Sequence, residues 1–105
     1  EPSLTALAAD CAAVANWMRE EASLDDRLAG SVPFCTMFAV AVPGWQLLRQ
    51  LQAVENGEAP GLAATKTASV RFFIDRVVPE ASGLRAAATA GAEPLYALST
   101  DQLVG

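Results

Sequence analysis

Few side chains in this sequence of 105 residues have the types and spacing that catalysis needs. A serine or cysteine nucleophile requires a base within hydrogen-bond reach, and the sequence contains no histidine to act as that base. Lys66 is the only lysine, and a buried lysine could serve as a base or form a Schiff base. We favour a solvated position for Lys66 on a helix face, which gives it no catalytic role.

Two pairs of adjacent carboxylates, Glu20–Glu21 and Asp25–Asp26, are the next candidates. Paired carboxylates can divide the roles of acid and base between them. These pairs stand where one predicted helix ends and the next begins. Capping, the helix dipole and solvation therefore explain them better than acid–base chemistry.

The two cysteines, Cys11 and Cys35, lie far apart in apolar surroundings. A zinc site needs about four ligands in clustered spacings, so these residues predict no metal site. We predict two buried, reduced thiols rather than a disulfide, because the chain has enough apolar residues to form a core without one. Reduced thiols indicate a reducing compartment, and we expect the protein to be cytoplasmic.

Arginines and aromatic residues gather in one further stretch, where Arg71 and Arg76 flank the run Phe72-Phe73-Ile74-Asp75. The arginines could hold an anionic ligand above an aromatic platform. We favour the simpler interpretation, with the phenylalanines in the core and the charged side chains in exposed ion pairs. Trp17 and Trp45 are interpreted as anchors of the core or of an interface. By its residues alone, the sequence predicts no catalytic, cofactor-binding or metal-ligating residue.

The charge distribution excludes two classes of partner. The formal net charge is -5, from 7 basic and 12 acidic residues, and no two basic residues are adjacent, so we expect no nucleic-acid binding. Residues 28–48 carry no charge and are long enough to cross a bilayer. Pro33 and Pro43 interrupt this stretch, and Arg27 and Arg49 flank it symmetrically. We therefore predict a buried central helix and no membrane span.

Apolar spacing predicts three long helices. The first covers residues 3–22 with Ser3 as its N-cap. Its apolar face consists of Leu4, Leu7, Cys11, Val14 and Met18. The second begins near Ser23 or near Ser31 and ends at Asn56-Gly57. It is apolar on two sides and should be kinked at Pro43, so it belongs at the centre of the molecule.

The third helix covers residues 60–90, with a kink or a break at Pro79 and a stop at Gly91. The last residues could form one short helix around 94–98, followed by a second cap or a loose end at residues 99–101. Sustained alternation of apolar and polar residues is absent, so strands are not expected. The predicted fold is all-α, an up-down helical bundle of three long helices plus a short C-terminal helix, in a single domain of residues 1–105. Because the first residue is Glu1 rather than Met, we expect the domain to be excised from a longer protein.

Three stretches together resemble a known family. They are Leu28–Phe34 followed by Met37-Phe38; Gly44-Trp45-Gln46-Leu47-Leu48; and Val70–Ala81 followed by Ala90-Gly91-Ala92-Glu93. In order and spacing they are similar to the extra C-terminal helical domain of large bacterial acyl-CoA dehydrogenases. The similarity extends from about Leu4 to Leu98.

The resemblance implies a larger flavoenzyme, of which this chain is the C-terminal domain. The parent would use FAD to oxidise an acyl-CoA to the 2,3-enoyl-CoA. Its catalytic base, its flavin and its acyl-CoA pocket would belong to upstream domains, so no catalytic residue and no cofactor are carried over to this chain. The domain would pack on the catalytic domains of the parent chain or of a neighbouring subunit, or form a homodimer. Its contact surface would lie around Trp17, Phe72 or Trp45.

A different class of function remains open. The chain could be a free-standing helical adaptor or a small-ligand-binding module with a pocket between helices. Such a module needs a polar group inside an apolar stripe, and only Thr36 and Thr67 are candidates.

Overall fold

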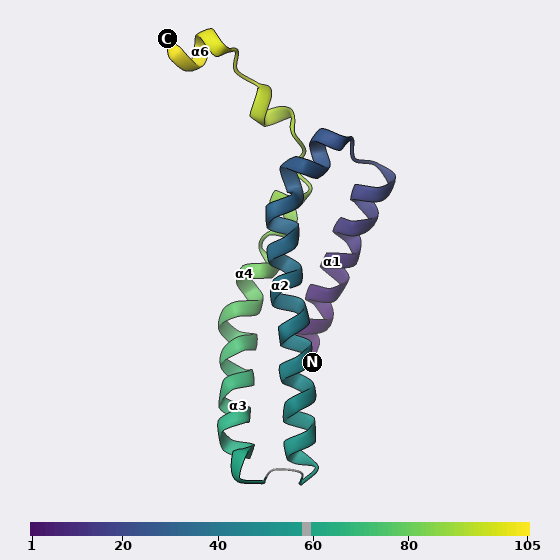
Figure 1. The fold of residues 1–105 in the computed structure, drawn as a ribbon, viewed down its shortest axis with the longest axis vertical. Helices are drawn as coiled ribbons and strands as arrows, with labels where there is room; N and C mark the ends of the chain where they lie inside the picture. Colours follow the sequence, from purple (N-terminus) through teal and green to yellow (C-terminus); the bar gives the residue numbers. More distant parts are fainter. Residues whose placement is uncertain (58–59) are drawn as a thin grey trace.

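The computed structural model describes residues 1–57 and 60–105 and is helical throughout, with no strand in these residues. The α-helices are α1 (Pro2–Glu20), α2 (Leu24–Glu55), α3 (Ala63–Phe72), α4 (Val78–Ser82), α5 (Arg85–Ala88) and α6 (Thr100–Val104). Figure 1 shows α2 along the long axis, with α1 beside its first half and α3 beside its second half. The turns between these helices are short, so each long helix runs antiparallel to its neighbour. The predicted all-α class is confirmed.

The start of α2 is fixed by a capping box at Ser23. The Ser23 hydroxyl oxygen accepts a hydrogen bond from the Asp26 N–H at 3.1 Å, and the Asp26 carboxylate accepts one from the Ser23 N–H at 3.2 Å. The second helix therefore begins near Ser23 and not near Ser31, and Pro33 and Pro43 both lie inside it. At the start of α1 the predicted N-cap is wrong, because the side chain of Glu1, not of Ser3, accepts from the Leu4 N–H.

The third predicted helix is broken into several pieces. A π-helical turn at Phe73–Val77 follows α3, and α4 and α5 are single short turns separated at Gly83-Leu84. Pro79 has no N–H and crowds the turn before it, and a widened π turn accommodates such a residue. The helical run continues through this π turn over residues 63–82, so the chain does not break at Pro79 itself, and the first break in the helix lies at Gly83-Leu84. The chain thus has two long helices and a third, interrupted one.

The residues after α5 form a tail that leaves the bundle (Figure 1). Gly91 adopts a φ of 83°, a left-handed conformation that suits glycine and ends the helical region. A 3₁₀ turn at Glu93–Tyr96 replaces the helix predicted around residues 94–98. Ser99 then caps α6 through a second capping box with Gln102, so the predicted second cap is confirmed.

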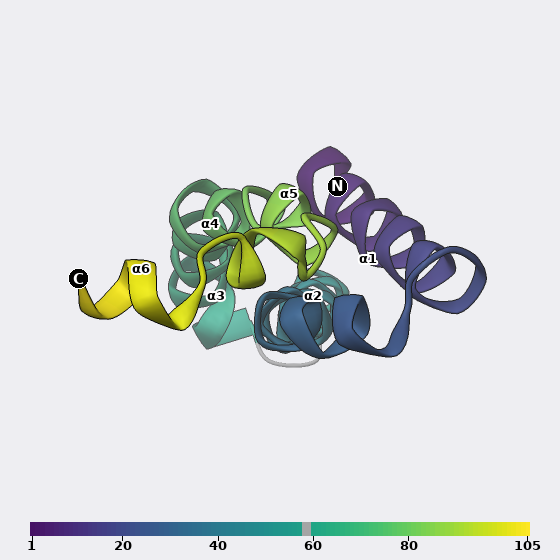
Figure 2. The same ribbon diagram turned by 90° about the horizontal axis from the view of Figure 1, so that it is seen from above.

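The core lies where α1, α2, α4 and α5 meet, as the view from above in Figure 2 shows. Its fully buried large side chains are Leu7, Val14, Met37 and Val78. Gly44 leaves room for the Phe73 ring, since a Cβ at this position would lie 2.9 Å from it. The apolar face predicted for the first helix is confirmed, with Leu4, Leu7, Cys11 and Val14 buried.

The second helix is central, but the prediction that both of its sides are buried is wrong. Only Gly30, Met37, Gly44 and Val54 of its 32 residues are buried. In length and apolar composition α2 meets the requirement for a membrane span. Only 17% of its most apolar 18-residue window is buried in the bundle, so most of this apolar stretch is left uncovered. The side of α2 that faces away from the core is exposed because no element of the described chain covers it (Figure 2).

The chain consequently exposes a large surface for its size. Its accessible area is 6955 Å². A compact monomer of this mass would expose about 5,600 Å², so roughly 1,400 Å² is in excess. The tail contributes five exposed apolar side chains to this area, and α2 contributes a further set.

Candidate functional site

The structure does not assemble the candidate catalytic residues into a site. Lys66 lies on α3, where its Nζ donates a hydrogen bond to Gln50 Oε1 of α2 at 2.6 Å. This contact holds the two helices together and leaves the ammonium partly exposed. Lys66 therefore lies on a helix face in contact with solvent, as the sequence predicts.

The paired carboxylates lie at a helix end and at a helix start and do not form one site. Glu20 pairs with Arg19 at 3.0 Å on an exposed helix end, and Asp25 is exposed in the first turn of α2. Ion pairs of this exposed kind contribute little to stability. The predicted capping role is confirmed for Asp26, which completes the capping box of Ser23.

Asp26 has a further partner that the sequence gives no sign of. Its Oδ1 accepts a hydrogen bond from the Ala92 N–H at 2.9 Å, which ties the start of the tail to the start of α2. This hydrogen bond, followed by those from Ser23, lowers the pKa of the Asp26 carboxyl below its usual value of 3.8. The charged form of Asp26 therefore stabilises the folded chain above that pH. This contribution is lost as the pH falls through the lowered pKa of the folded state.

Replacing Asp26 by asparagine should destabilise the domain at neutral pH and have a smaller effect in acid. The amide keeps an acceptor oxygen but loses the charge that strengthens the hydrogen bonds from Ala92 and Ser23. Urea unfolding followed by circular dichroism at about pH 7 and about pH 2.5 measures the difference. Asp25→Asn is the matched control, because Asp25 is an exposed carboxylate of the same turn. An equal loss for Asp26→Asn at both pH values would contradict the assigned role of the charge.

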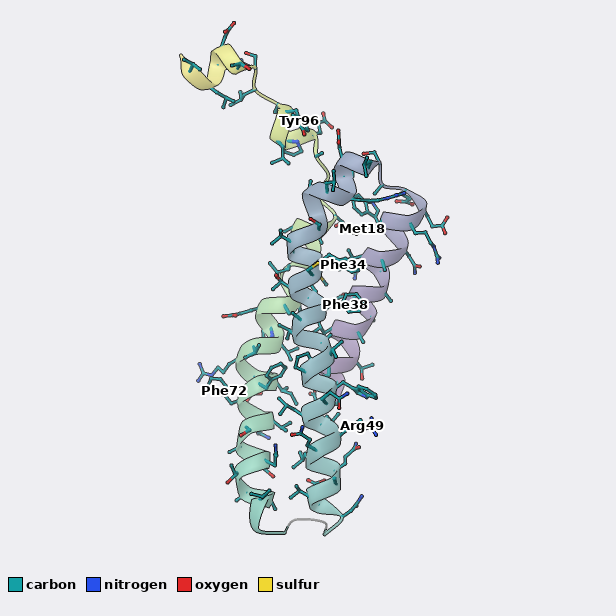
Figure 3. All side chains as sticks on the ribbon, in the orientation of Figure 1. Met18, Phe34, Phe38, Arg49, Phe72 and Tyr96 are labelled. Atoms are coloured by element: carbon teal, nitrogen blue, oxygen red, sulfur yellow. The ribbon has the colours of Figure 1, made fainter. Side chains whose placement is uncertain are left out.

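The arginine and aromatic stretch is divided between core and surface. Phe73 is half-buried against the core. Phe72 is exposed on α3, as Figure 3 shows. Arg71 pairs with Asp75, four residues later, in an exposed contact with an N···O distance of 3.8 Å. The predicted exposed pair is confirmed, but the core position predicted for Phe72 is wrong. Successive residues of a helix point about 100° apart, so Phe72 and Phe73 face different sides of it.

The two cysteines differ in their exposure to solvent. Both thiols are free, and Cys11 is buried, with its pKa raised by burial and by the nearby Asp10 charge. Cys35 is exposed, which corrects the prediction of a buried thiol.

The hydroxyls of Thr36 and Thr67 donate to the carbonyl oxygens four residues earlier in their own helices, so neither is directed at a ligand.

The feature best suited to binding is an apolar groove between α1 and α2. We call it the α1–α2 groove. It has a volume of about 320 Å³ and is lined by Ala8, Cys11, Ala12, Phe38, Ala41, Val42 and Trp45. A neighbouring hollow of about 250 Å³ extends it past Leu4 and Leu48 toward Glu1. Its lining on α1 consists of small side chains, and its lining on α2 includes Phe38 and Trp45.

Aromatic contacts fix the walls of the groove. Phe38 meets Phe34 edge to face with ring centroids 5.1 Å apart, and both are labelled in Figure 3. The Arg49 guanidinium lies 5.0 Å from the centroid of the Trp45 ring, at one end of the groove. Trp45 remains 54% exposed. Trp45 is therefore not part of the core, which removes the first of the two alternatives that its sequence context left open.

The lining of the groove limits its chemistry to binding. Its lining consists of apolar side chains and the Cys11 thiol, with the Arg49 guanidinium beside the Trp45 ring, and these groups do not fit the ring and phosphates of a flavin. No group of three or more His, Cys, Asp or Glu residues is arranged to hold a metal ion within residues 1–57 and 60–105. An apolar segment of a protein is the kind of surface that such walls accommodate.

Comparison with known families and proteins gives one result. The family model described as acetyl-CoA dehydrogenase C-terminal like matches residues 2–99. No match is found among curated proteins or among solved structures. The matched range covers α1 to α5 and the start of the tail, including both walls of the α1–α2 groove. The resemblance seen in the sequence is confirmed, and the chain belongs to the acetyl-CoA dehydrogenase C-terminal-like family.

Proposed function

We propose that this chain is an accessory packing domain of an FAD-dependent acyl-CoA dehydrogenase. The family match over residues 2–99 is the observation that carries the proposal. The parent would oxidise an acyl-CoA to the 2,3-enoyl-CoA, with FAD as hydride acceptor in domains outside this chain. This chain would contribute no catalytic group and would act by binding. Its free thiols support a reducing compartment, and we place the parent in the cytoplasm.

The α1–α2 groove is the surface that would dock on the catalytic domains of the parent or of a neighbouring subunit. An exposed tryptophan beside small alanines accepts a bulky apolar side chain and removes a large apolar area from water. Arg49 at the end of the groove would pair with a carboxylate on the docking partner. The exposed Phe72 lies on another helix and is available for a second contact.

Two measurements test this function. A denaturing blot of source-cell extract with an antibody against the chain should show a band several times larger than 10.9 kDa. The purified parent should then show flavin absorbance that acyl-CoA bleaches in the absence of oxygen. If the band is large but the purified parent shows no flavin that acyl-CoA bleaches, the parent is not an acyl-CoA dehydrogenase.

The docking role is tested in the same parent protein. Trp45→Ala should loosen the domain, so that limited proteolysis releases it faster than from the unmodified parent. Arg71→Ala changes an exposed residue of α3 outside the groove and is the matched control. Equal release from both variants would show that the groove is not the docking surface.

The size of the groove also favours a second function, that of a free-standing small-ligand-binding module. Its 320 Å³ lies at the lower end of the range found for ligand pockets. For this function the blot should show a band near 10.9 kDa. A fluorescent apolar probe should then bind to the chain, and Trp45→Ala should release it.

A further inference from the structure

The α1–α2 groove and the hollow beside it are two adjacent apolar spaces along the same pair of helices. We call the smaller space the Leu4 hollow; Leu4 and Leu48 are among the residues that line it. Three residues, Ala8, Ala41 and Trp45, line both spaces. A single partner seated against these three residues would therefore occupy both spaces at once.

The two spaces are offset by about one helical turn. On α1 the Leu4 hollow is lined at Leu4 and Ala8, and the groove is lined at Ala8 and Ala12. On α2 the offset is also three or four residues, since Leu48 lines only the hollow and Phe38 lines only the groove. Three or four residues of a helix span about 5–6 Å along its axis. Side chains four residues apart on a partner helix are separated by about the same distance, so one such pair would reach both spaces.

The chemistry of the groove favours a partner segment that satisfies its own backbone. The lining consists of apolar side chains and the Cys11 thiol. The backbone N–H and C=O groups of α1 and α2 beside the groove are engaged within those helices. An extended segment seated there would bury N–H and C=O groups that have no partner, which costs free energy. A helix makes these hydrogen bonds within itself and has no such cost.

We infer that the occupant of both spaces is one amphipathic helix of the docking partner, with two bulky apolar side chains four residues apart. This helix would lie along α1 and α2 and cover Phe38, Val42 and Trp45, three large apolar side chains that the chain leaves exposed. The inference rests on the docking role proposed for the groove. It adds the conformation and the sequence pattern of the partner.

A carboxylate completes the pattern on the partner helix. The Arg49 guanidinium lies 5.0 Å from the centroid of the Trp45 ring and forms no ion pair within residues 1–57 and 60–105. Arg49 follows Leu48, so an acidic residue about one turn beyond the apolar pair would reach it. The Glu1 carboxylate at this end is already engaged, because it accepts a hydrogen bond from the Leu4 N–H at 2.9 Å. An exposed ion pair adds only about two- to fivefold in affinity, but it fixes the register of the helix.

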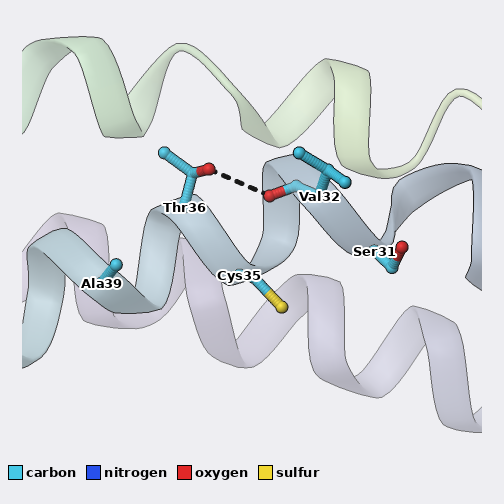
Figure 4. A pocket seen from close by; sticks show the side chains of 5 residues that line it. All are labelled: Ser31, Val32, Cys35, Thr36 and Ala39. Atoms are coloured by element: carbon cyan, nitrogen blue, oxygen red, sulfur yellow. Dashed lines mark hydrogen bonds between the residues drawn. The ribbon is translucent and has the colours of Figure 1, made fainter.

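The other uncovered side of α2 has no such pattern. Figure 4 shows a depression of about 310 Å³ there, lined by Ser31, Val32, Cys35, Thr36 and Ala39. The Thr36 hydroxyl donates a hydrogen bond to the Val32 carbonyl oxygen at 3.0 Å, and none of the five lining residues is aromatic or charged. These side chains give a partner neither an aromatic anchor nor a charge to set its position, so we assign the helix to the groove.

Binding of designed peptides to the 105-residue chain tests this pattern. The probe is a fluorescein-labelled helical peptide of about 18 residues, built on alanine and glutamine. It has leucines at i and i+4 and a glutamate three residues outside the pair at each end, so it can bind in either direction. Fluorescence anisotropy should give a Kd below about 1 mM. Replacing one leucine by alanine should weaken binding at least about tenfold, and replacing both glutamates by glutamine about two- to fivefold.

A second peptide separates a helical partner from an extended one. It has the same composition, with its leucines at i and i+2. These positions lie on opposite sides of a helix but on the same face of a strand. The second peptide should bind at least about tenfold more weakly than the first. Equal or tighter binding would assign the groove to an extended segment and overturn the inference.

Variants of the chain locate the bound peptide. Ala8 is exposed and lines both spaces, so Ala8→Leu should fill them and weaken binding at least about tenfold, with unchanged circular dichroism. Ala68→Leu makes the same change at an exposed position of α3 and should leave the Kd unchanged. In Trp17→Phe the only tryptophan is Trp45, and its emission should shift to shorter wavelength as the peptide covers it.

Two further results would overturn the inference. One is a first peptide that does not bind at about 1 mM; if dodecanoate then shifts the Trp45 emission, the groove belongs to an acyl chain. The other is peptide binding that Ala8→Leu does not weaken. A flavoenzyme parent without peptide binding would remove the helix and keep the proposed function. Peptide binding by a chain whose blot shows a band near 10.9 kDa would keep the helix and remove the parent.

Discussion

Leu7→Ala should be among the most destabilising single substitutions in this chain. Leu7 is fully buried between α1 and the elements that face it, together with Met37 and Val78. Removing three carbons there leaves a cavity and costs about 2–5 kcal/mol of unfolding free energy. The total unfolding free energy of a domain of this size is about 5–15 kcal/mol, so the variant should lose a large part of its stability. Urea unfolding at fixed protein concentration measures the loss.

Two controls separate a cavity from a general effect of the substitution. Leu103→Ala removes the same atoms from a side chain that is 71% exposed, and should change the unfolding free energy by no more than about 0.5 kcal/mol. Leu7→Met keeps the volume of the core and should cost less than about 1.5 kcal/mol. If Leu7→Ala is already unfolded without urea, Leu7→Met still reports on the site. A loss below about 1 kcal/mol for Leu7→Ala would show that the core is not at this crossing.

The first helix shows what the sequence can predict. Its residues at spacings of 3 and 4 form one face, and four of the five, including Leu7, are buried in the structure. The pattern works because α1 packs against α2, α4 and α5 on one side and faces water on the other. The capping box at Ser23 is equally local, since it involves only Ser23 and Asp26.

The third helix shows where such patterns fail. The 3 and 4 spacing continues unbroken from Ala63 to Ala88, yet the chain there forms α3, a π turn, α4 and α5. A π turn adds one residue to a turn, so residues beyond it move to another side. Both Phe72 and Phe73 were predicted to lie in the core as apolar residues of this stretch, and only Phe73 lies against it. The hydrogen bond from Ala92 to Asp26 spans 66 residues and has no signal in the sequence.

The candidate surfaces were predicted only in part. Trp45 was a candidate for an interface from its size and type, and it lines the α1–α2 groove. The sequence shows that α2 is apolar on more than one side, but an apolar pattern is the same whether a helix is covered by its own chain or by another. Which side remains open depends on where α1 and α5 pack, and long-range contacts of this kind are not encoded in local spacing.

Gly30→Ala should destabilise the domain even though alanine is the better helix former. In an exposed helix interior this change would stabilise by about 1 kcal/mol. At Gly30 a Cβ would overlap the Ala88 carbonyl oxygen at the end of α5, and would also lie 3.1 Å from the terminal methyl of Met18. The obstacle is backbone, so α5 must move away from α2, and the net loss should be about 1–3 kcal/mol.

Gly83→Ala is the control of opposite sign. A Cβ at Gly83 would lie 3.5 Å from its nearest neighbours, which is ordinary contact, and the backbone φ of -66° suits any residue. The change should stabilise the domain by about 0.4–1 kcal/mol by restricting the unfolded chain. Thermal unfolding of both variants measures the two shifts, downward for Gly30→Ala and upward for Gly83→Ala. A stabilising Gly30→Ala would mean that α2 and α5 do not touch at this point, and the bundle would lack the close contact on which its interrupted third helix depends.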